Sequence, residues 1–334
     1  MSDQMTHWER VRAALEGADL DRVPISVWRH FHSQERSAQG LADSMLAFQR
    51  AYDWDFMKVN PRASYHMEDW GLGLRFSDSD DIPHETVEWP IKRAADWASI
   101  EHLDIHSGVL GEHLEALDLI AKGLDGQVPF LMTVFNPLSI AASLAGSEEA
   151  MIEHMGAHPA EVHGALEVIT DVFSRYAVEC LEVGASGIFF ATTRWGTYDR
   201  LTEDEYSEFG RPYDLKVLDA VASAELNVLH VCASNNMLPL LADYPVEAFN
   251  WDAQDDTNVW LTEGAKLTGK TVIGGLPHRT VLLDGAPDEV AAEAAWTADL
   301  MGRSGWMLAP GCTIPPMVPE PNLNALRGSL SRPG

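Results

Sequence analysis

Three residues that lie far apart in the chain have the side chains of a zinc site. His230 and Cys232 are separated by one residue, and Cys312 lies near the C-terminus. Side chains two positions apart on a strand point to the same face, so the first pair can reach one ion. One histidine with two cysteines is a known catalytic zinc environment that leaves the fourth position open, and thiolates favour zinc over magnesium or calcium. From the residues alone, a buried histidine with two thiols acting as small hydrophobes remains the alternative.

Such a site favours chemistry at sulfur. A zinc ion with an open position either lowers the pKa of bound water or binds a substrate thiol as thiolate. Two cysteinate ligands put negative charge on the metal, which weakens its Lewis acidity but leaves a bound thiolate strongly nucleophilic. The pattern therefore favours attack of sulfur on a methyl group. The third cysteine, Cys180, lies in a long predicted helix, and we expect it to pack in the core.

The elements that position these residues alternate between short apolar runs and longer amphipathic segments. This alternation predicts a parallel sheet with helices outside, and eight such units predict an α/β fold of the closed (β/α)8 TIM barrel type, with residues 1–334 as a single domain. An open doubly wound sheet is the alternative. The eight predicted strands span residues 23–28, 56–59, 129–134, 187–191, 227–231, 248–251, 271–275 and 306–309.

Residues 71–90 interrupt this alternation with glycines, an acidic turn and Pro83. Residues 74–76 and 85–89 have the composition of two short strands around that turn. We predict a β-hairpin insertion after the second strand, which is a candidate lid.

Function in a (β/α)8 barrel lies at the C-terminal ends of the strands. Histidines there can move protons near neutral pH, arginines can bind a carboxylate or sulfonate, and aromatic rings can wall a pocket. Asp252 ends the sixth predicted strand and is a candidate partner of a zinc-bound histidine. The candidate catalytic residues are His278, Arg29 and Asp252, and the candidate substrate-binding residues are Trp28, His30, Arg62, Tyr65 and Arg194. For each of them a structural role, in a salt bridge or in core packing, is the alternative.

Composition excludes several classes of partner. The net charge is −28, from 51 acidic and 23 basic residues, which disfavours binding to nucleic acids and to anionic membranes. The N-terminal stretch lacks the pattern of a signal peptide, and no apolar run reaches the roughly 18 residues that span a bilayer. With only three cysteines, a disulfide framework is not expected, so the sequence predicts a cytoplasmic protein.

Three segments resemble the uroporphyrinogen decarboxylase superfamily. They are D-R-V-P at residues 21–24, the run from L-T-E-D-E-Y to R-P-Y at 201–213, and the glycine-rich run at 274–290 that ends in D-G-A-P-D-E-V. This resemblance extends from about residue 6 to the C-terminus and implies a (β/α)8 barrel.

Within that superfamily, the metal residues are similar to those of the methylcobamide:coenzyme M methyltransferases, which carry H-x-C-G-N and A-P-G-C-x-I-x-P-x-x-P. This chain has H-V-C-A-S-N from His230 and A-P-G-C-T-I-P-P-M-V-P from Ala309. The resemblance implies that His230, Cys232 and Cys312 bind zinc, which activates an acceptor thiol. It also implies a methylated corrinoid (cobalamin), carried by a partner protein, or a small methylated compound as donor. Ala233 replaces the family's glycine, and W-R-H-F at residues 28–31 is not typical of these enzymes.

The metal-free uroporphyrinogen decarboxylases carry an M-R-Q-A-G-R-Y loop after the first strand, whereas residues 27–33 here read V-W-R-H-F-H-S. One arginine remains of a loop that grips many carboxylates, which argues against that activity. We therefore predict a zinc-dependent methyltransferase that acts on a small thiol or methylated substrate. A metal-free decarboxylase and a non-catalytic corrinoid- or metal-binding accessory protein remain the alternatives, and a homo-oligomer is compatible with the sequence.

Overall fold

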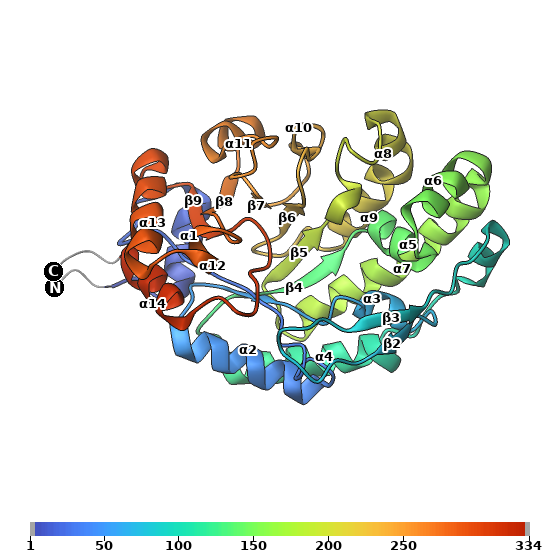
Figure 1. The fold of residues 1–334 in the computed structure, drawn as a ribbon, viewed down its shortest axis with the longest axis horizontal. Coiled ribbons are helices and arrows are strands. Elements are labelled where there is room, and N and C mark those ends of the chain that lie inside the picture. Colours follow the sequence, from blue (N-terminus) through green and yellow to red (C-terminus); the bar gives the residue numbers. More distant parts are fainter. Residues whose placement is uncertain (1–3, 331–334) are drawn as a thin grey trace.

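A computed structural model describes residues 4–330 and shows an α/β fold with one curled sheet of seven parallel strands (Figure 1). Chain order and spatial order agree, so each strand pairs with the next one along the sequence after an intervening helical segment. In order the strands are β1 (Met57–Val59), β4 (Phe130–Phe135), β5 (Gly187–Ala191), β6 (Val228–Val231), β7 (Ala248–Trp251), β8 (Thr271–Leu276) and β9 (Trp306–Pro310). Across the described residues, no helix combines the length and apolar character that crossing a membrane requires.

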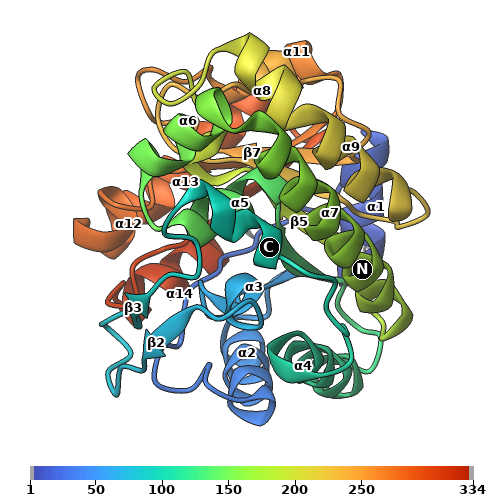
Figure 2. The ribbon, with the colours of Figure 1, turned by 90° about the vertical axis from the view of Figure 1, so that its right-hand side faces the viewer.

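Helices form the outer layer around this sheet (Figures 1 and 2). Strands covered in this way are buried and largely apolar, as in β5 and β6, where every residue is buried. The helices are α1 (His7–Glu16), α2 (Ala38–Tyr52), α3 (Tyr65–Glu68), α4 (Gly108–Leu124), α5 (Pro137–Ala145), α6 (Glu148–Ala157), α7 (Pro159–Glu182), α8 (Glu203–Phe209), α9 (Arg211–Ala220), α10 (Leu238–Leu241), α11 (Leu261–Thr268), α12 (Val281–Asp284), α13 (Pro287–Met301) and α14 (Glu320–Ser329), with 3-10 turns η1 (Ala94–Ser99) and η2 (Thr193–Trp195).

The passage from β4 to α5 shows how local sequence sets these boundaries. Asn136 follows the strand, and its side chain accepts a hydrogen bond from the backbone N–H of Ser139. Pro137 occupies the first helical turn, where its missing N–H costs nothing. The sequence F-N-P therefore ends a strand and begins a helix within two residues.

The first predicted strand, residues 23–28, is not regular. It forms a single parallel bridge between Ile25 and Leu308 of β9, and on its other side the N–H of Asp55 donates to the carbonyl of Ile25. The carboxylate of Asp55 accepts a hydrogen bond from the N–H of Ile25, and the hydroxyl of Ser26 donates to the carbonyl of Phe56. These bonds stand where ladder hydrogen bonds would otherwise form. The prediction of eight regular strands was therefore wrong by one, although this segment links the two edges of the sheet and makes it TIM-barrel-like.

The predicted hairpin is present: β2 (Gly73–Arg75) pairs with β3 (Glu85–Glu88) in antiparallel orientation. Figure 2 shows this pair outside the main sheet. The insertion is held to the preceding loop by Ser33, whose N–H and hydroxyl both donate to Asp80. Its function as a lid stays a prediction.

The D-R-V-P segment has a structural role. Arg10 of α1 donates to the carboxylates of Asp21 and Asp55, and Arg22 also donates to Asp55. Asp55 is fully buried just before β1, at the N-terminal end of the sheet. Residues at that end of a barrel are expected to stabilise the fold rather than to take part in chemistry.

Candidate metal centre

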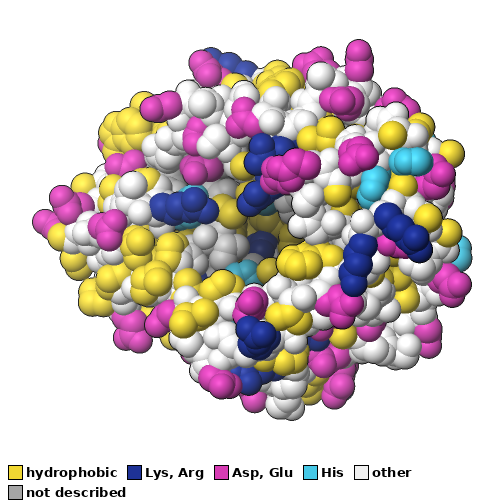
Figure 3. All heavy atoms as spheres, turned by 45° about the vertical axis from the view of Figure 1, so that its right-hand side comes forward, with side chains coloured by type: hydrophobic (Ala, Val, Ile, Leu, Met, Phe, Trp, Pro, Cys, Tyr) yellow, Lys and Arg dark blue, Asp and Glu magenta, His cyan; other side chains and the backbone are white. Residues whose placement is uncertain are grey.

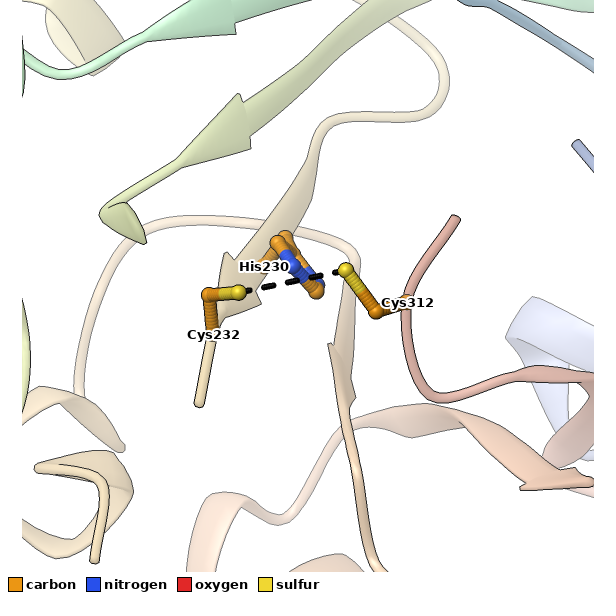
Figure 4. Close-up of side chains that lie close together, drawn as sticks. All are labelled: His230, Cys232 and Cys312. Carbon is orange, nitrogen blue, oxygen red and sulfur yellow. Dashed lines mark hydrogen bonds between the residues drawn. The ribbon is translucent and has the colours of Figure 1, made fainter. Parts of the chain in front are cut away.

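The structure brings His230, Cys232 and Cys312 together at the C-terminal end of the sheet, and Figure 4 shows the three side chains pointing toward one another. Their ligand atoms all lie within 4.8 Å of one another, and the two sulfur atoms are 3.9 Å apart. Zn–S bonds of about 2.3 Å in a tetrahedral site place two sulfurs about 3.8 Å apart. The donor set and its spacing therefore fit a zinc ion.

The imidazole of His230 is oriented for metal binding. Its Nδ1 lies 2.6 Å from Oδ1 of Asn250, whose own Nδ2 donates to the carbonyls of Ile273 and Pro310. Because Oδ1 is then the acceptor, Nδ1 of His230 carries the proton and Nε2 keeps its lone pair for a metal. The sequence made Asp252 the candidate partner of His230, but the partner in the structure is Asn250. The reason is that the register of β6 and β7 pairs residue 230 with residue 250.

The sulfur atoms of Cys232 and Cys312 are within hydrogen-bonding distance of each other. The hydrogen bond from Cys232 to Cys312 holds the pKa of Cys312 well below its ordinary value and raises that of Cys232. Burial opposes ionisation of both thiols. A divalent cation bound here would displace the thiol protons, because ligating sulfurs must be deprotonated.

Two cavities meet at these sulfurs. An inner cavity of about 210 Å³ lies within the sheet, and an outer cavity of about 510 Å³ opens to solvent; Cys232, Cys312 and Thr193 line both. Figure 3 shows a hollow in this face with Lys and Arg side chains around it. The metal residues thus separate a small inner chamber from a wider basin.

The structure divides the predicted substrate and catalytic residues between these cavities. Trp28 and His30 line the inner cavity, whereas Arg194, Asp252 and His278 line the outer one. Burial lowers the pKa of His278, whose Nδ1 lies 3.8 Å from Oδ2 of Asp252. These five residues are therefore placed where they can contact a ligand.

Three other predicted residues lie away from both cavities. Arg62 is 2% exposed and its guanidinium is bound by Glu68 and Glu112, so none of its forked donors is directed to a ligand. Tyr65 is buried and donates its hydroxyl to the carbonyl of Thr133. Arg29 packs over the ring of Phe31, 4.9 Å from its centre. The geometry favours a structural role for Arg62 and Tyr65, whereas a catalytic role for Arg29 stays a prediction.

Lys58 is a site residue that sequence reasoning missed. It lies in the middle of β1, is 4% exposed and lines the inner cavity. Its ammonium donates to Asn60 and lies 4.8 Å from the ring centre of Phe189. Burial lowers the pKa of Lys58 to about 7, although the nearby sulfurs of Cys312 and Cys232 oppose the shift. The sequence signal that could have identified Lys58 as a site residue is its position inside an otherwise apolar predicted strand.

Comparisons with known proteins agree with this architecture. The family model described as "Uroporphyrinogen decarboxylase (URO-D)" matches residues 6–331. The methylcobamide:CoM methyltransferase MtbA of Methanosarcina acetivorans is 22% identical over 97% of this chain and 97% of its own length. A uroporphyrinogen decarboxylase of Chlorobaculum tepidum is 29% identical over 71% of this chain and 69% of its own. The solved structure of a methyltransferase from Methanosarcina mazei has a TM-score of 0.82 at 22% identity, with 98% of each chain covered, and shows the same fold.

Proposed function

This chain belongs to the uroporphyrinogen decarboxylase family, and from that premise we propose that it is a zinc-dependent methyltransferase whose acceptor is a small thiol. The observation that carries the proposal is the meeting of one imidazole and two sulfurs, spaced as zinc ligands, at the mouth of a cavity. Two of the relatives support it by name, since they are methylcobamide:CoM methyltransferases.

In this proposal His230, Cys232 and Cys312 hold the zinc, and bound zinc supplies a site at which a thiol is kept as thiolate at neutral pH. Asn250 fixes the ring of His230. Trp28 and Phe189 wall the inner cavity with apolar surface, which excludes water from the sulfur. The acceptor sulfur then bonds to the methyl carbon as the bond between that carbon and the donor breaks.

The methyl donor approaches from the outer cavity, which is wide and polar. Three arginines and three aspartates line it, so its wall offers hydrogen-bonding groups of both charges to a donor: Arg194, Arg200, Arg279, Asp199, Asp252 and Asp255. We propose a methylated corrinoid on a partner protein, or a small methylated compound, as that donor. Arg194 already pairs with Glu148 at 2.8 Å, so its part is to shape the wall as well as to contact the donor.

The test combines metal analysis with turnover. We expect one zinc per chain in the wild type and in Cys180→Ser, and loss of zinc in Cys232→Ser and Cys312→Ser. The zinc-loaded wild type should methylate coenzyme M with methylcobalamin as donor, and both site variants should not. Cys180 is the matched control because it is buried in α7, away from the site. Release of carbon dioxide from a porphyrinogen by metal-free protein would instead support the decarboxylase alternative.

A further inference from the structure

His30 and a buried carboxylate form a dyad on the wall of the inner cavity. His30 lines that cavity together with Cys232 and Cys312, and its Nδ1 lies 3.0 Å from Oε2 of Glu35. Glu35 is 1% exposed. Burial opposes its ionisation, but hydrogen bonds from His30 and His32 outweigh burial and hold the pKa of Glu35 at about 2. The carboxylate is therefore ionised at neutral pH.

The donors around Glu35 fix the tautomer of His30. The backbone N–H of Phe31 donates to Oε2 at 3.2 Å, and Nδ1 of His32 lies 3.0 Å from Oε1. Nε2 of His84 lies 3.9 Å from Oε1 and carries its ring proton, because Nδ1 of His84 accepts the N–H of Ser77. An ionised carboxylate accepts only, so Nδ1 of His30 donates to it and Nε2 keeps a lone pair.

The ligand atoms of His30, His32 and Glu35 also lie within 4.8 Å of one another, a spacing that suits a metal ion. Both Nδ1 atoms, however, already donate to the carboxylate, which leaves them no lone pair for a cation. Among residues 4–330, no group hydrogen-bonds to Nε2 of His30. The group is thus a hydrogen-bonded network with one free ring nitrogen on a residue of the cavity wall.

We propose that His30 is the base that accepts the proton of the acceptor thiol and that Glu35 is its positioning residue. The inference rests on the proposed function. The S–H bond of the thiol breaks, the proton moves to Nε2 of His30, and the sulfur keeps the electron pair that later bonds to the methyl carbon. Glu35 stabilises the imidazolium through Nδ1, as a buried carboxylate does for a catalytic histidine.

The other charged groups near His30 do not fit this role. Arg29 donates from Nε to the carbonyl of His30, and the ring of His32 is stacked at 4.9 Å with its Nδ1 held by Glu35. Lys58 lines the same cavity and hydrogen-bonds to Asn60, but among residues 4–330 no carboxylate pairs with it as Glu35 does with His30. The sulfurs of the metal residues are themselves ligands. His30 is the cavity residue that combines a free lone pair with a buried counter-charge.

The experiment counts protons. Coenzyme M is titrated calorimetrically into zinc-loaded protein at about pH 8, where an ordinary imidazole is neutral, in two buffers of different ionisation enthalpy. We expect the wild type to release clearly less than one proton to the buffer, because His30 keeps it while the thiolate is bound. His30→Gln should release about one, and Glu35→Gln should fall between them. His102→Gln is the matched control, since His102 also pairs with a carboxylate, Asp171 at 3.0 Å, but on the surface.

Each result decides between the two proposals. Binding of coenzyme M with the same proton release in His30→Gln and wild type overturns this inference and leaves the proposed function standing. A zinc-loaded wild type that binds no coenzyme M overturns both. If Glu35→Gln does not fold, as judged by circular dichroism, His30→Gln alone carries the test, because His30 is part-exposed and only its partner is deeply buried.

Discussion

Asn250 holds the imidazole of His230 through a hydrogen bond of 2.6 Å and is itself held by the carbonyls of Ile273 and Pro310. One amide on β7 therefore joins a residue of β6 to the middle of β8 and the end of β9. Because Cys312 follows directly after β9, the same amide ties two of the three metal residues to one rigid part of the sheet. The orientation of the His230 ring is therefore set by residues of the strands, whereas Cys232 and Cys312 lie just beyond the strand ends.

This relationship predicts that Asn250→Ala lowers zinc affinity about 10- to 100-fold, because the ring of His230 loses the acceptor that fixes its tautomer. Competition for zinc with a chromogenic chelator measures the change. Asn250→Asp is the matched control, since it keeps an acceptor for His230 but leaves two carbonyls without a donor. It should retain zinc better than Asn250→Ala while losing about 1–3 kcal/mol of stability. Equal affinity in wild type and Asn250→Ala would contradict this account.

The three cysteines should differ in their reaction with iodoacetamide. Cys180 is fully buried in α7, and burial raises the pKa of its thiol. Cys232 and Cys312 line both cavities, and the hydrogen bond from Cys232 holds the pKa of Cys312 below its ordinary value. We expect metal-free protein to be alkylated first at Cys312 and more slowly at Cys232, zinc to protect both, and Cys180 to react only after unfolding. Peptide mass spectrometry reads the sites, and early labelling of Cys180 would refute the assignment.

Sequence pattern predicted that His230, Cys232 and Cys312 meet, because strand ends on one rim must converge. His230, Cys232 and Cys312 each end or follow an apolar run, and the topology of a parallel curled sheet brings such positions together. The hairpin at 71–90 was predictable because the composition of its turn is a local feature of the sequence. The sheet has seven regular strands and not eight because the carboxylate of Asp55 accepts the N–H of Ile25 in place of a ladder bond in the first predicted strand.

Residues that owe their role to a distant partner were not predictable in this way. Arg62 follows a strand end as a ligand-binding arginine would, but its guanidinium donates hydrogen bonds to Glu68 and Glu112. Asn250 and Lys58 lie within strands that read as apolar core, and only the register of neighbouring strands shows that they face the site. The amino-acid pattern shows where a side chain starts, whereas the tertiary contacts decide what remains free.

Asp55 should carry much of the acid sensitivity of the fold. It is fully buried between Arg10 and Arg22, so Asp55→Asn leaves buried positive charge and should cost about 3–5 kcal/mol. Burial raises its pKa, but hydrogen bonds from His7 and Arg22 outweigh burial and lower it overall. The carboxylate therefore stabilises the fold fully above about pH 4 and progressively less as the pH falls. Urea unfolding of metal-free protein measures this.

In that series, the difference in stability between wild type and Asp55→Asn should shrink as the pH is lowered below about 4. Asp53→Asn is the control, because Asp53 is an exposed neighbour that pairs with His7 and Arg327 at the surface. Its effect should stay below about 1 kcal/mol. A difference between wild type and Asp55→Asn that does not change with pH would show that the carboxylate charge is not the cause.

Lys58 should act in the opposite direction to Asp55, because its charge is disfavoured in the folded protein. Burial lowers the pKa of Lys58 from 10.5 to about 7. As the pH falls below 10.5, the unfolded chain binds a proton at Lys58 more readily than the folded protein, so the folded state loses stability. This loss is complete below about pH 7. Lys58→Met removes that charge and fills similar space between Trp28 and Phe189, whose ring centres lie 5.8 and 4.8 Å from the ammonium.

We therefore expect metal-free Lys58→Met to be more stable than wild type at about pH 6, by on the order of 3 kcal/mol, with the difference vanishing towards pH 10. Urea unfolding at the two pH values measures it, and Lys122→Met, which changes an exposed lysine paired with Asp118 at a helix end, is the control. A gain that is equal at both pH values would mean that Met simply packs better. A loss at pH 6 would mean that the bond to Asn60 and the sulfurs nearby outweigh burial.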